Sequence, residues 1–438
     1  METSLVHPTA TTRPVASPKR SAMWWPLWPN CAMLLVASTV VVALQMLWYT
    51  GIGYNNIFVP DGDTYYNFLK DEFLSPDYFT LVFDVTPNPG VYILYYPFFL
   101  VSDRLCIVPN FILMVLSLVL CVRLFHPFGS TATWLASLAV SLNPYTLLGI
   151  TGPNKETALT FLVLLFVYSA VAKRSLTGVL LSLLVITLVR PLYAIIFLGC
   201  WFLILCFQNK VRFTSLVLLS PVLVAVFSQF IYQAPEMAES FFAAYSSADT
   251  PLDYYSVSLS GASNPLVALV MYLFRCLGNA FSTMVRFSPF TEEGEWALLG
   301  AGYGVYGMAL AFGMMNLLFY FGSRIVSARR VELADRRAQP GGWTFSSVPS
   351  ASLQLTALTV LFFWMCTSIN FFIQSRYLMP ILPVLFGILG ATITRRRFVQ
   401  IAAFLLVLAG LYFGAQWALA FKSAPPVIHE SFKPEYLP

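Results

Sequence analysis

Charged residues are scarce in this sequence: Asp, Glu, Lys and Arg make up 10% of its 438 residues, whereas 58% are hydrophobic. A water-soluble domain carries about 25% charged residues, so a soluble globular protein is excluded. The alternation of polar and apolar residues is also missing, since runs such as 161–172 and 401–409 show no period of two. A transmembrane β-barrel needs that alternation in segments of about ten residues, so it is excluded as well.

Cysteine patterns that would hold a metal or a disulfide framework are lacking too. Seven cysteines lie at positions 31, 106, 121, 200, 206, 276 and 366, mostly inside apolar runs and at no metal-ligand spacing. This pattern is typical of small core residues rather than of zinc ligands or disulfides. There is also no clear internal repeat of the kind that forms the inverted halves of a transporter.

The sequence does contain apolar runs of about 20 residues, each long enough to cross about 30 Å of hydrocarbon as a helix. They recur from Cys31 to Phe421 with short polar breaks. The runs predict an all-α polytopic membrane protein with about eleven transmembrane helices. The expected spans are residues 31–49, 105–124, 131–149, 156–172, 175–190, 191–208, 213–232, 297–321, 353–373, 378–394 and 398–421.

The distribution of charge predicts the orientation of these helices. With the N-terminus inside and the C-terminus outside, 16 of the 25 Lys and Arg residues lie inside, and 17 of the 20 Asp and Glu residues lie outside. The basic bias is the positive-inside signal, so the net charge of +5 follows topology and does not indicate a nucleic-acid partner. The acidic excess outside is not part of that rule, and it favours a polar site in the outer half of the membrane.

Two further apolar stretches, 90–102 and 264–286, are expected in the outer interface rather than across the bilayer. If 90–102 crossed, the later basic clusters would face outward, against the positive-inside rule. That stretch is also short and rich in Pro and Tyr, and Arg275 interrupts the second one. We therefore expect helices that lie at the outer surface of the bundle in both places.

One transmembrane domain is expected over residues 31–421, with outer segments at 51–104 and 233–296. Residues 1–30 are rich in Pro, Ser and Thr and have the composition of a disordered cytoplasmic tail. Residues 422–438 are expected to form a short tail on the outer face.

The first outer segment contains Val59-Pro-Asp-Gly-Asp-Thr-Tyr-Tyr-Asn, directly after the first span. Asp61 and Asp63 are separated by one glycine, so their side chains can converge on one small region. Such a pair can bind a divalent cation, bond to sugar hydroxyls or accept a proton, whereas the plainer alternative is a solvated Asp-Gly turn. The same segment carries Tyr65, Tyr66, Tyr92 and Tyr95. Their rings and hydroxyls suit a sugar, although tyrosines also anchor membrane rims.

A second polar constellation, Asn143–Glu156, is expected to turn at the outer surface between two spans. Lys155 and Glu156 begin the next helix. A glutamate at a helix start is favoured by the helix dipole, so Glu156 can be a simple first-turn carboxylate or a substrate ligand. A lysine there is opposed by the dipole and by desolvation, so Lys155 indicates an anionic partner, either a carboxylate or a lipid phosphate.

Two arginines are expected on the same outer side. Arg190 lies between two spans with almost no loop, and Arg376 opens the stretch Arg-Tyr-Leu-Met-Pro-Ile-Leu-Pro. A charge inside a membrane costs ~2.5 kcal/mol or more, so these side chains are expected either to face a polar cavity or to extend to the interface. A guanidinium suits a phosphate because it makes two parallel hydrogen bonds.

The order of these features resembles the GT-C superfamily of polytopic glycosyltransferases. The matching features are a first span, the outer Asp61-Gly-Asp63, a Pro-rich aromatic outer helix, the Lys155-Glu156 turn and the late Arg376–Pro383 stretch. The resemblance implies a polyprenyl phosphate or diphosphate sugar donor, a lipid or glycan acceptor, and action on the outer face of a bacterial inner (cytoplasmic) membrane. It covers most of the chain.

The resemblance also implies roles for individual residues. Asp61 and Asp63 correspond to the acidic residues that act as base or metal ligand, so a divalent cation is a conceivable cofactor. Lys155, Arg190 and Arg376 correspond, more loosely, to the basic residues that hold the donor phosphate. Substrate contacts would come from Glu156 and the four tyrosines.

Other functions stay open on the sequence alone. A chain of this layout is also similar to the polymerases of O-antigen and exopolysaccharide synthesis, which join lipid-linked repeat units. A flippase for lipid-linked sugars would equally account for intramembrane arginines, but it would place more charges deep in several spans. A scaffold protein would not explain why acidic residues concentrate on one face.

Overall fold

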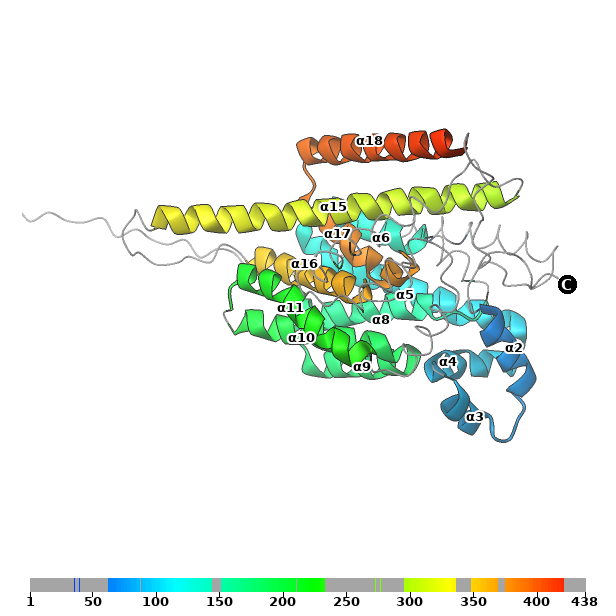
Figure 1. The fold of residues 1–438 in the computed structure, drawn as a ribbon. Coiled ribbons are helices and arrows are strands. Elements are labelled where there is room, and N and C mark those ends of the chain that lie inside the picture. The colour runs from blue at the N-terminus through cyan, green and yellow to red at the C-terminus, as the bar shows by residue number, and fades with distance from the viewer. Residues whose placement is uncertain are drawn as a thin grey trace, which may run out of the picture.

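Figure 1 shows a computed structural model of the chain, in which every regular element of the described residues is a helix. The structure describes residues 62–86, 88–143, 150, 152–209, 211–232, 295–335, 348–368 and 375–420, with Leu35, Thr39, Tyr272 and Cys276 as isolated residues. The side chains of some residues in these ranges, including Asp63 and Arg376, lie outside the description. The all-α prediction is confirmed for the described part of the chain.

The helices follow one another through mostly short connections. The first group comprises α2 (Gly62–Glu72), α3 (Tyr78–Val85), α4 (Pro89–Phe99) and the short turn η2 (Asp103–Cys106). The second comprises α5 (Ile107–Phe125), η3 (His126–Phe128), α6 (Ser130–Ser141), α8 (Glu156–Val167) with its π-helical end η4 (Tyr168–Lys173), α9 (Leu176–Val189), α10 (Pro191–Gln208) and α11 (Phe213–Tyr232). The third comprises α15 (Glu295–Asp335), α16 (Val348–Thr367), η5 (Ser375–Ile381), α17 (Leu382–Thr392) and α18 (Arg395–Ala420).

Among the described residues, four helical segments are long and apolar enough to cross a membrane. They are Ile107–Phe128, Glu156–Lys173, Pro191–Gln208 and Val305–Val326, and shorter apolar helices cover Leu176–Val189, Phe213–Val224, Ala351–Thr367 and Leu378–Thr392. All overlap segments that the sequence predicts as spans, and they indicate an all-α membrane protein. The total of eleven crossings stays a prediction, because 31–49 and 264–286 lie outside the described residues except at isolated positions.

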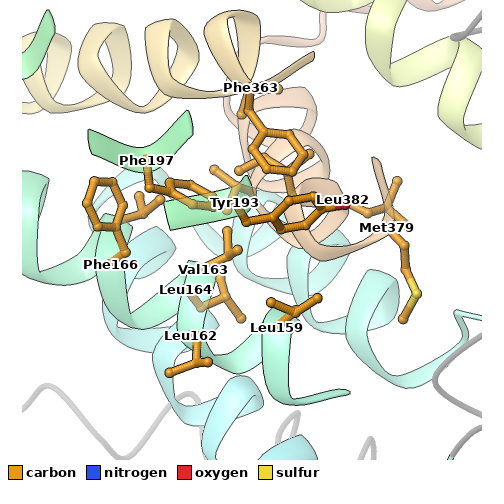
Figure 2. Close-up of a cluster of buried hydrophobic side chains, with 14 of the residues drawn as sticks. Leu159, Leu162, Val163, Leu164, Phe166, Tyr193, Phe197, Phe363, Met379 and Leu382 are labelled. Carbon is orange, nitrogen blue, oxygen red and sulfur yellow. The ribbon is translucent and has the colours of Figure 1, made fainter. Parts of the chain in front are cut away.

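The core of the bundle is built around α8, which packs against α5, α9 and η5. Figure 2 shows side chains of α8, α10, α16, η5 and α17 meeting in one cluster, namely Leu159, Leu162, Val163, Leu164, Phe166, Tyr193, Phe197, Phe363, Met379 and Leu382. The ring of Phe197 lies 4.9 Å from that of Phe166 and 5.2 Å from that of Phe363, measured between centroids. This packing holds α8, which follows Lys155 in the chain, and η5, which contains Arg376, in one core.

Helices α6 and α17 approach closely because two glycines of α17 face α6 and the end of α5. A Cβ atom at Gly387 would lie 2.3 Å from the buried ring of Phe125, and one at Gly390 would lie 2.6 Å from the Cα atom of Ala132. No real Cβ atom tolerates such distances. Small residues at helix contacts are typical of membrane bundles, where close backbone packing replaces the hydrophobic effect.

The two longest helices, α15 and α18, lie side by side along one face of the bundle (Figure 1). Helix α15 has 41 residues, which corresponds to about 60 Å at 1.5 Å per residue. It therefore extends well beyond the predicted span 297–321. Helix α18 contacts α15 through a small buried cluster, formed by Ala311, Ile401 and Leu405, that is separate from the main core.

Helix α4 corresponds to the stretch 90–102, which the sequence places in the outer interface. It has 11 residues with Pro97 inside it, so it is shorter than any of the four candidate spans. It packs on α2 and on the end of α9, where a Cβ atom at Gly90 would lie 2.9 Å from the Leu188 carbonyl carbon. In Figure 1, α2, α3 and α4 lie together at one end of the bundle.

Candidate functional site

The start of α8 lies at the end of the bundle where α2 and α4 pack. Lys155 is the residue before the helix, and Glu156 is its first residue, as the sequence predicts. The Asn154 side-chain oxygen accepts a 2.9 Å hydrogen bond from the Thr157 amide, which satisfies one of the free amides of the first turn. This cap fixes where the helix begins and therefore where both charged side chains emerge.

A buried polar network braces the turn that precedes α8. The Asn110 side-chain nitrogen, on α5, donates to the Ile150 and Gly152 carbonyls at 3.1 and 2.8 Å. The Tyr95 hydroxyl, on α4, bonds to the Asn110 side-chain oxygen and lies 3.0 Å from the Asn154 carbonyl. In return, the Asn154 amide donates to the Tyr95 oxygen at 3.2 Å. Three separate elements are thus tied together at this point.

The Tyr95 hydroxyl stays protonated in this setting. Burial raises the pKa of Tyr95 well above its ordinary value, whereas its hydrogen bonds to Asn154 and Asn110 act in the opposite direction. Tyr95 therefore acts as a neutral hydrogen-bonding group in this network.

Lys155 joins α8 to the aromatic side chains of α2 and α4. Its ammonium donates a 3.1 Å hydrogen bond to the Tyr65 hydroxyl and lies 5.6 Å from the centre of the Tyr65 ring. The Asn88 side chain donates to the same hydroxyl at 3.3 Å, and the Tyr92 ring meets the Tyr65 ring edge-on at 5.5 Å. Lys155 is only 7% exposed, so its charge is held inside the protein rather than in solvent.

Glu156 and Thr157 present buried oxygen atoms without partners in the described part of the chain. Glu156 is 6% exposed and its Oε2 atom has no hydrogen-bond partner there, and the same holds for Oγ1 of Thr157. A buried carboxylate oxygen left unpaired is costly, because transfer out of water removes its hydration. Both atoms therefore keep unused hydrogen-bonding capacity within the described residues.

Arg190 lies at the junction of α9 and α10, beside the start of α4. It ends α9 in an extended backbone conformation, and its guanidinium lies 4.7 Å from the centre of the Tyr193 ring. Tyr193 in turn belongs to the core cluster with Met379 and Leu382 (Figure 2). Arg190 is therefore positioned by the same core that holds η5.

The remaining predicted residues divide into two groups. Tyr66 is turned away from Lys155: its hydroxyl donates to Asp103 at 2.7 Å, and its ring meets Phe99. Asp61 lies outside the described residues, and Asp63 and Arg376 are described as backbone only, in α2 and η5. Of the ten predicted site residues, the structure brings Tyr65, Tyr92, Tyr95, Lys155 and Glu156 together at the start of α8.

Sequence reasoning missed the asparagines of this site. Asn88, Asn110 and Asn154 position Tyr65, Tyr95 and the start of α8. Asn110 is a single amide within an otherwise apolar run, which was an available signal because a buried amide in a membrane helix needs partners. Nothing in the sequence indicated that its partners would be the carbonyls before α8.

A divalent cation at Asp61 and Asp63 stays a prediction, because their side chains lie outside the description. The described residues contain no group of three or more His, Cys, Asp and Glu side chains that could hold a metal ion. Comparison of the chain with protein-family models, with curated proteins and with solved structures found no match.

Proposed function

We propose that this protein is a membrane glycosyltransferase that takes a sugar from a polyprenyl phosphate or diphosphate donor at the outer face of a bacterial inner membrane. The observation that carries the proposal is the buried charge at the start of α8. Lys155 and Glu156 lie next to each other at the end of an apolar bundle, covered by tyrosines of α2 and α4. A positive charge, an acceptor oxygen and aromatic rings are the groups that bind a sugar phosphate.

The cluster also lies next to the acidic segment. Tyr65 bonds to Lys155 and belongs to the same helix, α2, that contains the backbone of Asp63. Asp61 immediately precedes that helix in the chain. A carboxylate base and a phosphate-binding lysine would therefore come from adjoining elements, as an in-line sugar transfer requires.

In the proposed reaction, an acceptor hydroxyl attacks the anomeric carbon of the donor sugar. The new carbon–oxygen bond forms while the bond to the phosphate oxygen breaks, and Asp61 takes the hydroxyl proton. Negative charge grows on the departing phosphate, where Lys155, with Arg190 and Arg376, stabilises it. Glu156 and Thr157 would accept hydrogen bonds from sugar hydroxyls, and Asp63 would orient the acceptor or hold a cation.

The proposal is tested with the purified chain and polyprenyl phosphate, the common part of all such donors. Lys155→Met should weaken binding of this lipid about tenfold or more, because a charge-assisted hydrogen bond is lost. Lys173→Met, which removes an exposed lysine at the opposite end of α8, is the matched control and should bind as the wild type does. Equal binding by the Lys155→Met protein would remove Lys155 from the site.

Catalysis needs a second measurement, with a panel of polyprenyl-phosphate sugars and membrane extract as acceptor. Formation of a new glycosidic bond, lost in Asp61→Asn, supports a transferase. A product that grows by repeat units assigns the chain to the polymerases. Movement of the lipid-linked sugar across the bilayer without a new glycosidic bond would contradict the proposed enzymatic function and would favour a flippase.

A further inference from the structure

A groove lies between α15 and the start of α18, away from the candidate functional site. Its volume is about 590 Å³, and most of its lining is apolar, from Met315, Leu318, Phe319 and Val326. Among the described residues, the one charged side chain in the lining is Arg397, and Gly322 forms part of the wall. A groove of this size is within the usual range for sites that bind small molecules.

The described charged residues around the groove are basic. Arg395 and Arg396, next to Arg397 in sequence, are exposed, and Arg324 of α15 is partly exposed with its guanidinium over the Tyr320 ring. No carboxylate of the described part of the chain lines the groove. The predicted topology places this end of the bundle at the cytoplasmic surface, where anionic lipids are attracted to basic residues.

Arg397 is poised to accept an anionic partner. Within the described residues, its guanidinium makes a long hydrogen bond of 3.5 Å to the Thr392 carbonyl. A guanidinium has five N–H donors in a planar fork that matches phosphate oxygens. One weak contact therefore leaves most of this capacity for a ligand.

The packing of α18 shows what a ligand would add. The helix meets α15 through a small cluster of three buried residues and through the Phe398 ring, which lies 5.2 Å from the Phe312 ring between centroids. Phe398 and Val399 are nevertheless more than half exposed. An acyl chain in the groove would extend the apolar contact between α15 and α18. A free anion would satisfy Arg397 but leave the apolar wall uncovered.

We propose that this groove binds an anionic phospholipid, with the lipid phosphate on Arg397 and an acyl chain against the apolar wall of α15. Basic pockets between membrane helices on the cytoplasmic side commonly bind anionic headgroups. The site is independent of the proposed glycosyl transfer, since it lies at the other end of the predicted spans. Its occupant holds α18 to the bundle.

The experiment measures retention of single lipids by the purified full chain in detergent, using native mass spectrometry. The probes are phosphatidylglycerol and phosphatidylcholine with identical acyl chains. Wild-type protein should bind phosphatidylglycerol at least tenfold more tightly. Arg397→Ala should lower the affinity for phosphatidylglycerol about tenfold, because the lost group is a charge-assisted donor to the lipid phosphate. Arg397→Lys should retain part of it, which also guards against a folding defect in the alanine variant.

A second variant tests the shape of the groove rather than its charge. A Cβ atom added at Gly322 would meet nothing within 4 Å, so Gly322→Leu should fill the groove without disturbing the fold. It should lower binding of the anionic lipid about tenfold. Gly410→Leu, also in open space but on α18 away from the groove, is the matched control.

Three results would overturn the proposal. The first is equal affinity for the two lipids. The second is wild-type binding by both Arg397→Ala and Gly322→Leu. The third is complete displacement of the lipid by inorganic phosphate at equal concentration, which would assign the groove to a small anion.

Discussion

Asn110 shows how one buried amide can hold the start of α8 in place. It bonds to two carbonyls and to the Tyr95 hydroxyl, and it is fully buried. Asn110→Leu keeps the approximate volume but removes the side-chain donor to both buried carbonyls and the acceptor of the Tyr95 hydroxyl, so it should lower the free energy of unfolding by about 2–4 kcal/mol. Thermal unfolding in detergent measures this change. Asn209→Leu, at the exposed end of α10, should have a much smaller effect.

The raised pKa of Tyr95 leads to a prediction about protein stability at alkaline pH. Its pKa is raised in the folded protein above the ordinary value of 10.0, chiefly by burial. Above pH 10 the unfolded chain therefore loses a proton that the folded chain keeps, so this contribution to stability falls as pH rises. Tyr95→Phe removes the ionisable group and its hydrogen bonds. The variant should be less stable at pH 8, and the gap to the wild type should narrow between pH 10 and 11 in denaturant unfolding measured across that range. A gap that stays constant across this range would show that the raised pKa of Tyr95 does not contribute.

The charged residues Lys155 and Glu156 of the candidate site could be identified from the sequence, but the residues that position them could not. Lys155 and Glu156 were identifiable because a lysine at a helix start is unfavourable and requires a reason. Tyr65 and Tyr66 were indistinguishable in sequence, yet they point to Lys155 and to Asp103 respectively. Neighbouring residues on a helix point about 100° apart, so only the packing of α2 decides which one faces α8.

At the scale of helices, the contact between α6 and α17 gives a sharp test. Gly390 lies against backbone atoms of Ala132, which cannot move aside as a side chain can. Gly390→Ala should therefore lower the free energy of unfolding by about 1–3 kcal/mol through overpacking. Gly410→Ala, where nothing lies within 4 Å of the added Cβ atom, should instead be neutral or stabilising by roughly 0.5–1 kcal/mol. Both changes are read from thermal unfolding in detergent.

If Gly410→Ala lowered the free energy of unfolding more than Gly390→Ala does, the close approach of α6 and α17 would be contradicted.

The sequence alone could not identify this contact, because Gly390 and Gly410 both lie within apolar runs that have the composition of membrane helices. Helix ends were more predictable: Pro191 and Arg190 mark the junction of α9 and α10 in the sequence as in the structure. The π-helical end of α8 had no signal, since it depends on how η4 packs on α9 and α10.

At the scale of the whole molecule, the segments of the candidate site come from distant parts of the chain. Helices α2 and α4, the start of α8 and the junction of α9 and α10 meet at one end of the bundle. The groove of Arg397 involves α15, α17 and α18 instead. The predicted topology assigns these two regions to opposite faces of the membrane. Both the proposed glycosyl transfer at the outer face and the proposed lipid binding at the cytoplasmic face therefore depend on the orientation of the bundle.

Cysteine labelling tests that orientation on exposed, described residues. Leu74, in the turn after α2, is 76% exposed and belongs to the predicted outer segment, and Asn209 is exposed at the predicted inner end of α10. Leu74→Cys should react with an impermeant maleimide in intact spheroplasts, whereas Asn209→Cys should react only after lysis. The unmodified chain, with its native thiols, gives the background to subtract.

Reaction of Asn209→Cys in intact spheroplasts would show that the orientation of the bundle is the reverse of the predicted one, because α10 is one continuous helix from Pro191 to Gln208. The lysine at the start of α8 would then face the cytoplasm and could not meet a donor on the outer face. The groove of Arg397 would equally lie on the outer side, away from the cytoplasmic basic surface that favours an anionic lipid. If only Leu74→Cys reacts in intact spheroplasts, the start of α8 lies on the outer side and the groove of Arg397 lies on the cytoplasmic side, as both proposals require.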